Sequence, residues 1–213
     1  MSDQLSIAGT ALEYFHVCAF FNSRDEEYDV LAPFFAQGVQ QGEKNVHIVD
    51  PCLMDEHRAR LSAAGIDTSR CEACGLLEIL PWRKAYLDEH GVFDKDRMLA
   101  TLDAMANSAP DGAYRRLRIM GNMDWALHGG AATPEKLIEY EAEVNDVLSR
   151  NRQPAVCVYD VSKLSGAMMM DLLRTHPLTI VGGVVQENPF YTPPAQMLRE
   201  LRAREQPAPS AAA

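Results

Sequence analysis

The residue pair with the most evident chemistry is His16 and Cys18, which lie two positions apart in the apolar segment 15–21. Residues two apart in a β-strand point to the same face, so this imidazole and thiol would share one face. Such a pair can bind a soft metal ion or line a small-molecule pocket. The alternative is that both side chains pack beneath a helix, and the sequence leaves these interpretations open.

A second candidate is the pair Cys71 and Cys74, with Cys52 and His57 upstream. Zinc ligands occur at this spacing, but a closed zinc site needs four of them. Nothing in the sequence brings Cys52 and His57 to the pair, and His57 is expected on the surface, whereas His47 is expected to be structural. The favoured interpretation is two reduced thiols without a metal, and a redox switch is the alternative.

The segment after the first apolar run does not suit a phosphate. Residues 22–27 read Asn-Ser-Arg-Asp-Glu-Glu, with neither the glycines nor the lysine that a P-loop requires. Three of the six are acidic and would repel a triphosphate. The motifs G-x-G-x-x-G and G-x-S-x-G are also absent from the chain, so nucleotide hydrolysis and serine nucleophile chemistry are disfavoured.

The elements that would position these residues alternate along the chain. Short apolar strands are expected at 15–21, 46–49, 76–80, 117–120, 155–159 and 178–181. Helices are expected from Ser23 to a stop at Gly42, and at 54–64, 94–106, from 133 onward, 165–174 and 194–204, with 83–93 irregular. This alternation predicts an α/β fold with three layers, in which helices cover both faces of a mostly parallel sheet.

One domain is expected over residues 12–204. Residues 1–11 are weakly patterned, and we expect them to be weakly ordered. Residues 205–213 form a tail rich in proline and alanine, and we expect it to be disordered.

Ligands of doubly wound sheets bind at the carboxyl ends of the strands. Aromatic and polar residues follow several of the expected strands, and Gly182-Gly183 would belong to the same rim. The predicted ligand-binding residues are His16, Cys18, Trp82, Tyr86, Asn122, Asp124, Trp125, Tyr159, Asp160 and Glu187.

Composition and charge exclude several classes of partner. The 213 residues include 20 Lys and Arg and 30 Asp and Glu, a formal net charge of −10. Such a surface repels nucleic acid and anionic lipid, so neither direct nucleic-acid binding nor membrane binding is expected. There is no apolar run of roughly 20 residues and no visible signal peptide. The odd number of five cysteines favours reduced thiols in the cytoplasm.

Several segments together resemble the MEDS domain, the methanogen/methylotroph, dichloromethane-regulator sensory domain. The resemblance extends over about residues 12–202. It rests on segments 16–21, 31–38, 42–43, 80–82, 120–127, 157–160, 172–177 and 187–191.

The resemblance implies a RecA/KaiC-like fold without its nucleotide-binding loop, in agreement with the sequence of residues 22–27. It also implies a sensory module for small organic compounds. Family members are often fused to a helix-turn-helix or to signalling domains, which are not visible here. We therefore expect the output to depend on a partner protein such as a kinase or a transcription regulator. We also expect a homo-oligomer, most simply a homodimer.

Two other functions stay open. The chain could be a protein-docking module that derives from an ATPase fold and binds no ligand. It could also be a small-molecule enzyme, with Asp124, Asp160 or Glu187 as general acid or base near His16 or Cys18. The sequence favours a binding module over an enzyme and identifies no cofactor.

Overall fold

The centre of the protein is a seven-stranded sheet in the order β5-β4-β6-β7-β3-β8-β9. A computed structural model describes residues 5–7, 10–12, 16–107, 114, 116–127 and 130–205. The strands are β3 (His16–Phe21), β4 (Lys44–Val49), β5 (Leu77–Pro81), β6 (Leu117–Asn122), β7 (Ala155–Asp160), β8 (Leu178–Val181) and β9 (Val184–Glu187). Neighbours pair in parallel except β8 and β9, which are antiparallel.

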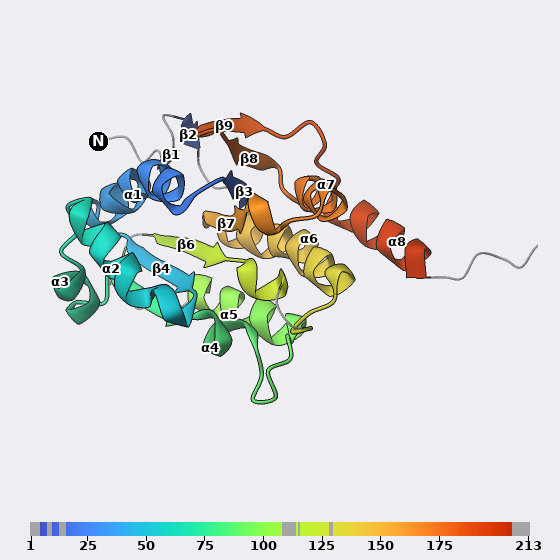
Figure 1. Cartoon of the computed structure of the whole chain (residues 1–213), viewed down its shortest axis with the longest axis horizontal. Helices are drawn as coiled ribbons and strands as arrows, with labels where there is room; N and C mark the ends of the chain where they lie inside the picture. Colours follow the sequence, from blue (N-terminus) through green and yellow to red (C-terminus); the bar gives the residue numbers. More distant parts are fainter. Residues whose placement is uncertain are drawn as a thin grey trace, which may run out of the picture.

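Helices cover both faces of this sheet, which confirms the predicted α/β architecture of three layers. They are α1 (Arg24–Gln40), α2 (Met54–Ala63), α3 (Thr68–Ala73), α4 (Trp82–Tyr86), α5 (Lys95–Asn107), α6 (Pro134–Asn151), α7 (Gly166–Thr175) and α8 (Pro194–Glu205). Three short 3-10 turns are Pro51–Leu53, Asp124–Leu127 and Val161–Lys163. Figure 1 shows α1, α2 and α3 grouped on one side of the view and α6, α7 and α8 toward the other.

The alternation of side chains along β3 divides the core into two halves. Cys18 and Phe20 belong to a buried cluster that includes side chains from α4, α5, α6, α7 and α8. Val17, Ala19 and Phe21 belong to a second cluster with side chains from α1, α2 and α3. Because successive residues of a strand point to opposite faces, a continuous apolar strand serves both halves.

The start of α1 follows from its sequence. The Ser23 hydroxyl accepts a hydrogen bond from the backbone N–H of Glu26 at 3.2 Å. The Glu26 carboxylate accepts from the backbone N–H of Asn22 at 2.9 Å, one residue earlier than in a standard capping box. The helix continues through Pro33, which lies on its exposed side, where water can hydrate the carbonyl that loses its partner.

Several local features differ from the sequence-based expectations. Segment 83–93 was expected to be irregular, but its first four residues belong to the short helix α4 (Trp82–Tyr86). Helix α3 and strand β9 were not predicted. Gly182 and Gly183 both have positive φ, at 58° and 73°, and form the tight turn between β8 and β9 instead of part of a ligand rim.

The two ends of the chain are described in part. In the N-terminal segment that was expected to be weakly ordered, strands β1 (Leu5–Ile7) and β2 (Thr10–Leu12) pair in an antiparallel hairpin, and Ile7 is buried. Helix α8 ends at Glu205, and residues 206–213 of the predicted tail lie outside the described part of the chain. Within the described residues, no helix has the length and apolar character needed to span a membrane.

Candidate functional site

A small cavity lies where the carboxyl ends of β3, β6 and β7 meet. Its volume is about 70 Å³, and we call it the rim cavity. Its lining residues are Phe21, Ser23, Arg24, Glu27, Leu53, Asn122, Asp124, Val158, Tyr159, Asp160 and Lys163. The sheet brings them together because Phe21 pairs with Asp160 in register, and Asn122 pairs with Val158.

Acidic and basic side chains contribute five of the eleven lining residues of the rim cavity. The Lys163 ammonium lies 2.5 Å from one Asp124 carboxylate oxygen and 3.3 Å from an Asp160 oxygen. Burial raises the pKa of Glu27 to about 7, against the opposing effect of Arg24. The cavity therefore contains the Lys163 ammonium between the carboxylates of Asp124 and Asp160, together with the Glu27 carboxyl group, which titrates near neutral pH.

Four of the predicted ligand-binding residues line this cavity, namely Asn122, Asp124, Tyr159 and Asp160. Asn122 also fixes the turn after β6, since its side-chain oxygen accepts from the Asp124 N–H at 3.1 Å. Sequence reasoning missed Arg24, Glu27 and Lys163 as lining residues. Arg24 and Glu27 lie in the acidic segment 22–27, in the first turn of α1.

Three predicted aromatic residues, Trp82, Tyr86 and Trp125, belong to the core and do not line the rim cavity. Tyr86 stacks on Trp125 with ring centroids 4.6 Å apart, and Phe93 packs against the same indole at 4.8 Å. Tyr86 and Trp125 are buried, and the partly buried Trp82 packs against the same cluster. Gly121 makes room for Tyr86, because a Cβ at this position would lie 2.5 Å from the tyrosine oxygen.

Two other predicted residues lie at the opposite end of the sheet. His16 opens β3, five residues before Phe21, which corresponds to about 16 Å along a strand. Glu187 is exposed on β9 and pairs with Leu178, the first residue of β8. Asp124 and Asp160 therefore lie at the other end of the sheet from His16, one of the two residues near which the enzyme hypothesis places its general acid or base.

His16 belongs to a second group of polar residues, which is buried between the sheet and α6. We call His16, Glu141, Cys157 and His176 the Glu141 cluster. Its four ligand-type atoms all lie within 4.8 Å of one another. Nε2 of His16 and Nε2 of His176 each lie 3.3 Å from the same Glu141 oxygen, Oε2. The Cys157 sulfur lies 3.3 Å from His16 Nε2 and 3.5 Å from that oxygen.

Burial and charge set the ionisation of the Glu141 cluster. Burial by itself would raise the pKa of Glu141, but the contacts with His16 and His176 hold it below its usual range. Burial, reinforced by His176, lowers the pKa of His16 to about 4. Burial and the charge of Glu141 raise the pKa of the Cys157 thiol well above its ordinary value. Near neutral pH the cluster therefore contains a carboxylate, a neutral His16 and a protonated thiol.

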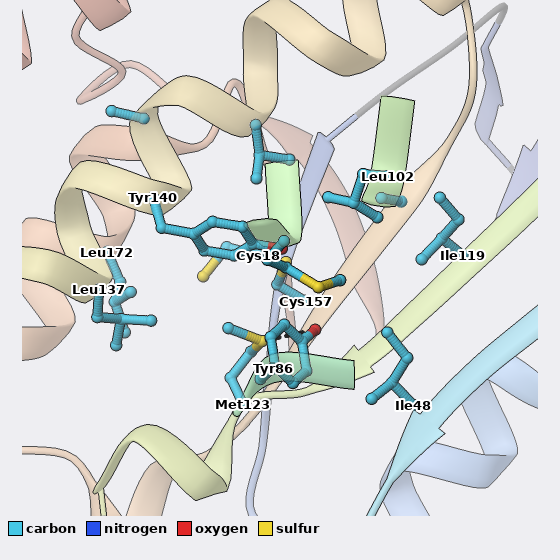
Figure 2. Close-up of a cluster of buried hydrophobic side chains, with 14 of the residues drawn as sticks. Cys18, Ile48, Tyr86, Leu102, Ile119, Met123, Leu137, Tyr140, Cys157 and Leu172 are labelled. Atoms are coloured by element: carbon cyan, nitrogen blue, oxygen red, sulfur yellow. Dashed lines mark hydrogen bonds between the residues drawn. The ribbon is translucent and has the colours of Figure 1, made fainter. Parts of the chain in front are cut away.

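Cys18 lies next to this cluster. It pairs in register with Cys157, and burial followed by the charge of Glu141 raises the pKa of its thiol. Figure 2 shows Cys18 and Cys157 close together beside Tyr140, in the apolar surroundings that α6 and α7 provide. The shared face of His16 and Cys18 is thus as predicted, but the close partners of His16 come from α6, β7 and the residue after α7.

Tyr159 belongs to both sites. It lines the rim cavity, and its hydroxyl donates a hydrogen bond to Oε1 of Glu141 at 2.7 Å. Among the described residues, it is the one that both lines the cavity and donates a hydrogen bond to Glu141. A change in the cavity that moves the Tyr159 side chain would also change the hydrogen bond that Oε1 of Glu141 accepts.

The predicted surface position of His57 is wrong. His57 is buried, and its Nδ1 lies 2.5 Å from the Tyr28 hydroxyl. Its Nε2 lies 2.8 Å from Nδ1 of His47, and we call these three residues the Tyr28 cluster. Because its ring nitrogens have these partners, His57 does not join Cys71 and Cys74 in a metal site. Cys71 is buried and Cys74 is exposed.

Sequence reasoning also missed Glu141, Cys157 and His176 as parts of a site. One signal was available for Glu141. It lies between Leu137 and Val144 on the buried face of α6. A carboxylate among buried positions of a helix needs partners in the core. The sequence alone does not say that those partners come from β3, β7 and the end of α7.

Comparison with known proteins places this fold in a class. The crystal structure of flagellar accessory protein FlaH from Methanocaldococcus jannaschii superposes with a TM-score of 0.54, covering 85% of this chain and 83% of that one at 7% identity. The protein thus has the predicted RecA-like fold.

The family follows from the sequence match. Residues 15–177 match the MEDS family, described as the MEthanogen/methylotroph, DcmR Sensory domain, and the chain belongs to this family. It is also similar to the transcriptional repressor DcmR of Methylorubrum extorquens (strain DSM 6343 / CIP 106787 / DM4), at 25% identity over 185 residues. That alignment covers 80% of this chain and 61% of the repressor.

Proposed function

We propose that the protein is a sensory module that binds a small organic molecule in the rim cavity and transmits this state to a regulatory partner protein. The observation that carries the proposal is the position and size of the cavity. It lies at the carboxyl ends of the parallel strands, where ligands of such sheets bind. Its volume of about 70 Å³ is several times the roughly 10–15 Å³ that one water molecule requires.

The size favours a compound of a few non-hydrogen atoms over a nucleotide. The lining supports the same choice, since Asp124 and Asp160 would repel a triphosphate. Lys163 and Arg24 can interact with a polar or halogenated end of a ligand. Phe21 and Leu53 supply apolar contact for a short carbon skeleton.

The regulatory part of the proposal rests on the family and on the relative. MEDS domains are described as sensory, and the relative is named a transcriptional repressor. This chain spans 61% of the length of that repressor. We assign the output to a partner protein that recognises the liganded state. All five cysteines are free thiols, which supports a reducing compartment such as the cytoplasm.

Thermal unfolding in the presence of a ligand panel tests the proposal. The probes are halomethanes, short alcohols, short amines and short carboxylates, with ATP and Mg²⁺ as the comparison. We expect one of the organic classes to raise the Tm, because a ligand that binds the folded state stabilises it. The variant Lys163→Gln should weaken that ligand at least about tenfold, the equivalent of roughly 1.4 kcal/mol.

Lys95→Gln is the matched control. Lys95 also bridges two carboxylates, at 2.8 Å from Glu143 and 3.1 Å from Glu139, but it lies outside the rim cavity. Ligand affinity should be unchanged in this variant. Silence across the organic panel, or equal affinity in both lysine variants, would reject the proposal and favour a docking module without a ligand.

A further inference from the structure

We propose that the Glu141 cluster binds a divalent transition-metal ion, with Zn²⁺ as the ion that its donor set fits best. The cluster lies apart from the rim cavity that the proposed function uses. Four donors, two imidazole nitrogens, one carboxylate oxygen and one sulfur, converge on one point inside the core. This is the number of ligands that a closed zinc site requires.

Four of the six separations between the donor atoms match a tetrahedral ion, and all six are within 4.8 Å. Bonds of roughly 2.0–2.3 Å to zinc place neighbouring ligand atoms about 3.3–3.7 Å apart at the corners of a tetrahedron. The separations from Glu141 Oε2 are 3.3 Å to each histidine Nε2 and 3.5 Å to the Cys157 sulfur. The contact between His16 Nε2 and the sulfur is 3.3 Å.

The hydrogen bonds around the cluster fix both histidine tautomers. Nδ1 of His176 lies 2.8 Å from the Leu172 carbonyl oxygen, which can only accept, so this nitrogen bears the proton. The Asn145 amide nitrogen donates to the backbone carbonyls of Glu141, Ala142 and Thr175. Its oxygen therefore faces Nδ1 of His16, at 3.2 Å, and makes that nitrogen a donor as well.

In the neutral imidazoles, these tautomers leave lone pairs on both Nε2 atoms, and the lone pairs point toward Glu141. Among the described residues, Nε2 of His176 makes no hydrogen bond, although it lies 3.3 Å from Glu141 Oε2. Three acceptors thus meet around a single donor, the Cys157 thiol. Buried acceptors in contact with one another are costly unless a proton or a metal cation lies between them.

The partners of each donor atom are those of a metal site. Ligating histidines usually donate their other N–H to a carbonyl or amide oxygen, as His16 and His176 do. The second oxygen of Glu141 accepts from the Tyr159 hydroxyl at 2.7 Å. One carboxylate and one thiolate neutralise a divalent ion, so the occupied site has no net charge. Binding displaces the Cys157 proton, which passes to solvent.

Cobalt substitution in the full-length chain tests the proposal. Because the four ligands are buried, the protein is first unfolded in guanidinium with reductant and chelator. The chelator is then removed, and the protein is refolded with Co²⁺. We expect one Co²⁺ per chain, visible d–d bands of a tetrahedral ion and a near-ultraviolet charge-transfer band from a thiolate. Addition of Zn²⁺ should bleach both features.

Cysteine variants identify the sulfur ligand. Cys157→Ser should lose the charge-transfer band. The double variant Cys52→Ser/Cys74→Ser removes two exposed thiols and disrupts the pair Cys71 and Cys74, so it should fold and keep the band. Cys18→Ser is the buried control, since Cys18 pairs in register with Cys157 but is not one of the four ligands.

Tyr159→Phe removes the donor to Glu141 and should weaken metal affinity about 10–100-fold, whereas Tyr28→Phe should leave it unchanged. A wild-type chain without the charge-transfer band would overturn the proposal. So would loss of the band in Cys52→Ser/Cys74→Ser, or its persistence in Cys157→Ser. These spectra are independent of the organic ligand panel, so either proposal can fail without the other.

Discussion

The protein buries two groups of histidines, on opposite faces of its sheet, and they differ in how their protons are distributed. In the Tyr28 cluster, a hydroxyl and two imidazoles form a linear chain, with contacts of 2.5 and 2.8 Å. Each contact in this chain can pair one donor with one acceptor. In the Glu141 cluster, two imidazoles and a thiol converge on one carboxylate oxygen.

The difference shows that buried histidines by themselves do not identify a site. Neutral hydrogen bonds join the members of the Tyr28 cluster, although Nε2 of His47 has no hydrogen-bond partner among the described residues. Burial lowers the pKa of His57 to about 3, so its imidazole is neutral. The Glu141 cluster adds a buried charge and an excess of acceptors. The convergence of two imidazoles and a thiol on one buried carboxylate oxygen is the feature that separates a candidate metal centre from structural packing.

Removal of the central carboxylate should have the largest effect. We expect Glu141→Ala to lower the free energy of unfolding by about 3–5 kcal/mol, because it leaves buried polar partners uncompensated. Urea unfolding measures the change, and Glu141→Gln serves if the alanine variant does not fold. The control is Glu143→Ala on the same helix, which loses a partly exposed ion pair with Lys95 and should cost less than about 1 kcal/mol. Equal losses would contradict the comparison.

The pH dependence of stability should report on the side of the sheet that α1 covers, where Glu27 precedes Tyr28. The folded state keeps the Glu27 proton up to a pKa of about 7, whereas the unfolded chain releases it near 4.5. Between these values the folded state binds more protons, so stability should fall as pH rises, by up to about 3 kcal/mol. Glu27→Gln should remove this slope in urea unfolding from pH 5 to pH 8. Asp29→Asn, on the exposed side of α1, should keep it.

Two tyrosine variants compare the clusters directly. Tyr159→Phe removes a hydrogen bond to a buried carboxylate and should cost about 1.5–3 kcal/mol. Chemical denaturation of this variant in the presence of chelator gives the value without any contribution from metal. A stability loss smaller than that of Tyr28→Phe would show that the Glu141 carboxylate has other hydrogen-bond donors.

The smallest effect is expected at the second tyrosine. Tyr28→Phe removes a contact with the neutral His57 imidazole and should cost about 1 kcal/mol. Its other partner, Arg24, is half-exposed and can be hydrated instead. Denaturation under the same conditions as for Tyr159→Phe provides the measurement, and a loss above 3 kcal/mol would place a charge in the Tyr28 cluster.

Much of the fold could be predicted from short-range signals. Ser23 and Ser165 accept backbone hydrogen bonds as N-caps, and Pro134 begins α6 after the cap Thr133. These signals act within a few residues, so they do not depend on the rest of the chain. The hairpin at Gly182 and Gly183 was misinterpreted although its signal was present, because a glycine pair also suits a loop at the ligand edge.

The sequence by itself determined the alternation of strands and helices and the absence of a phosphate-binding loop. It also determined that Asn122, Asp124 and Asp160 follow strands that end at one edge. The tertiary structure alone decided that His16 meets Cys157, 141 residues away, and Asn145, 129 residues away. The physical reason is that contacts across the sheet depend on strand order and register. Both are set by the packing of the whole core, and no local pattern of residues encodes them.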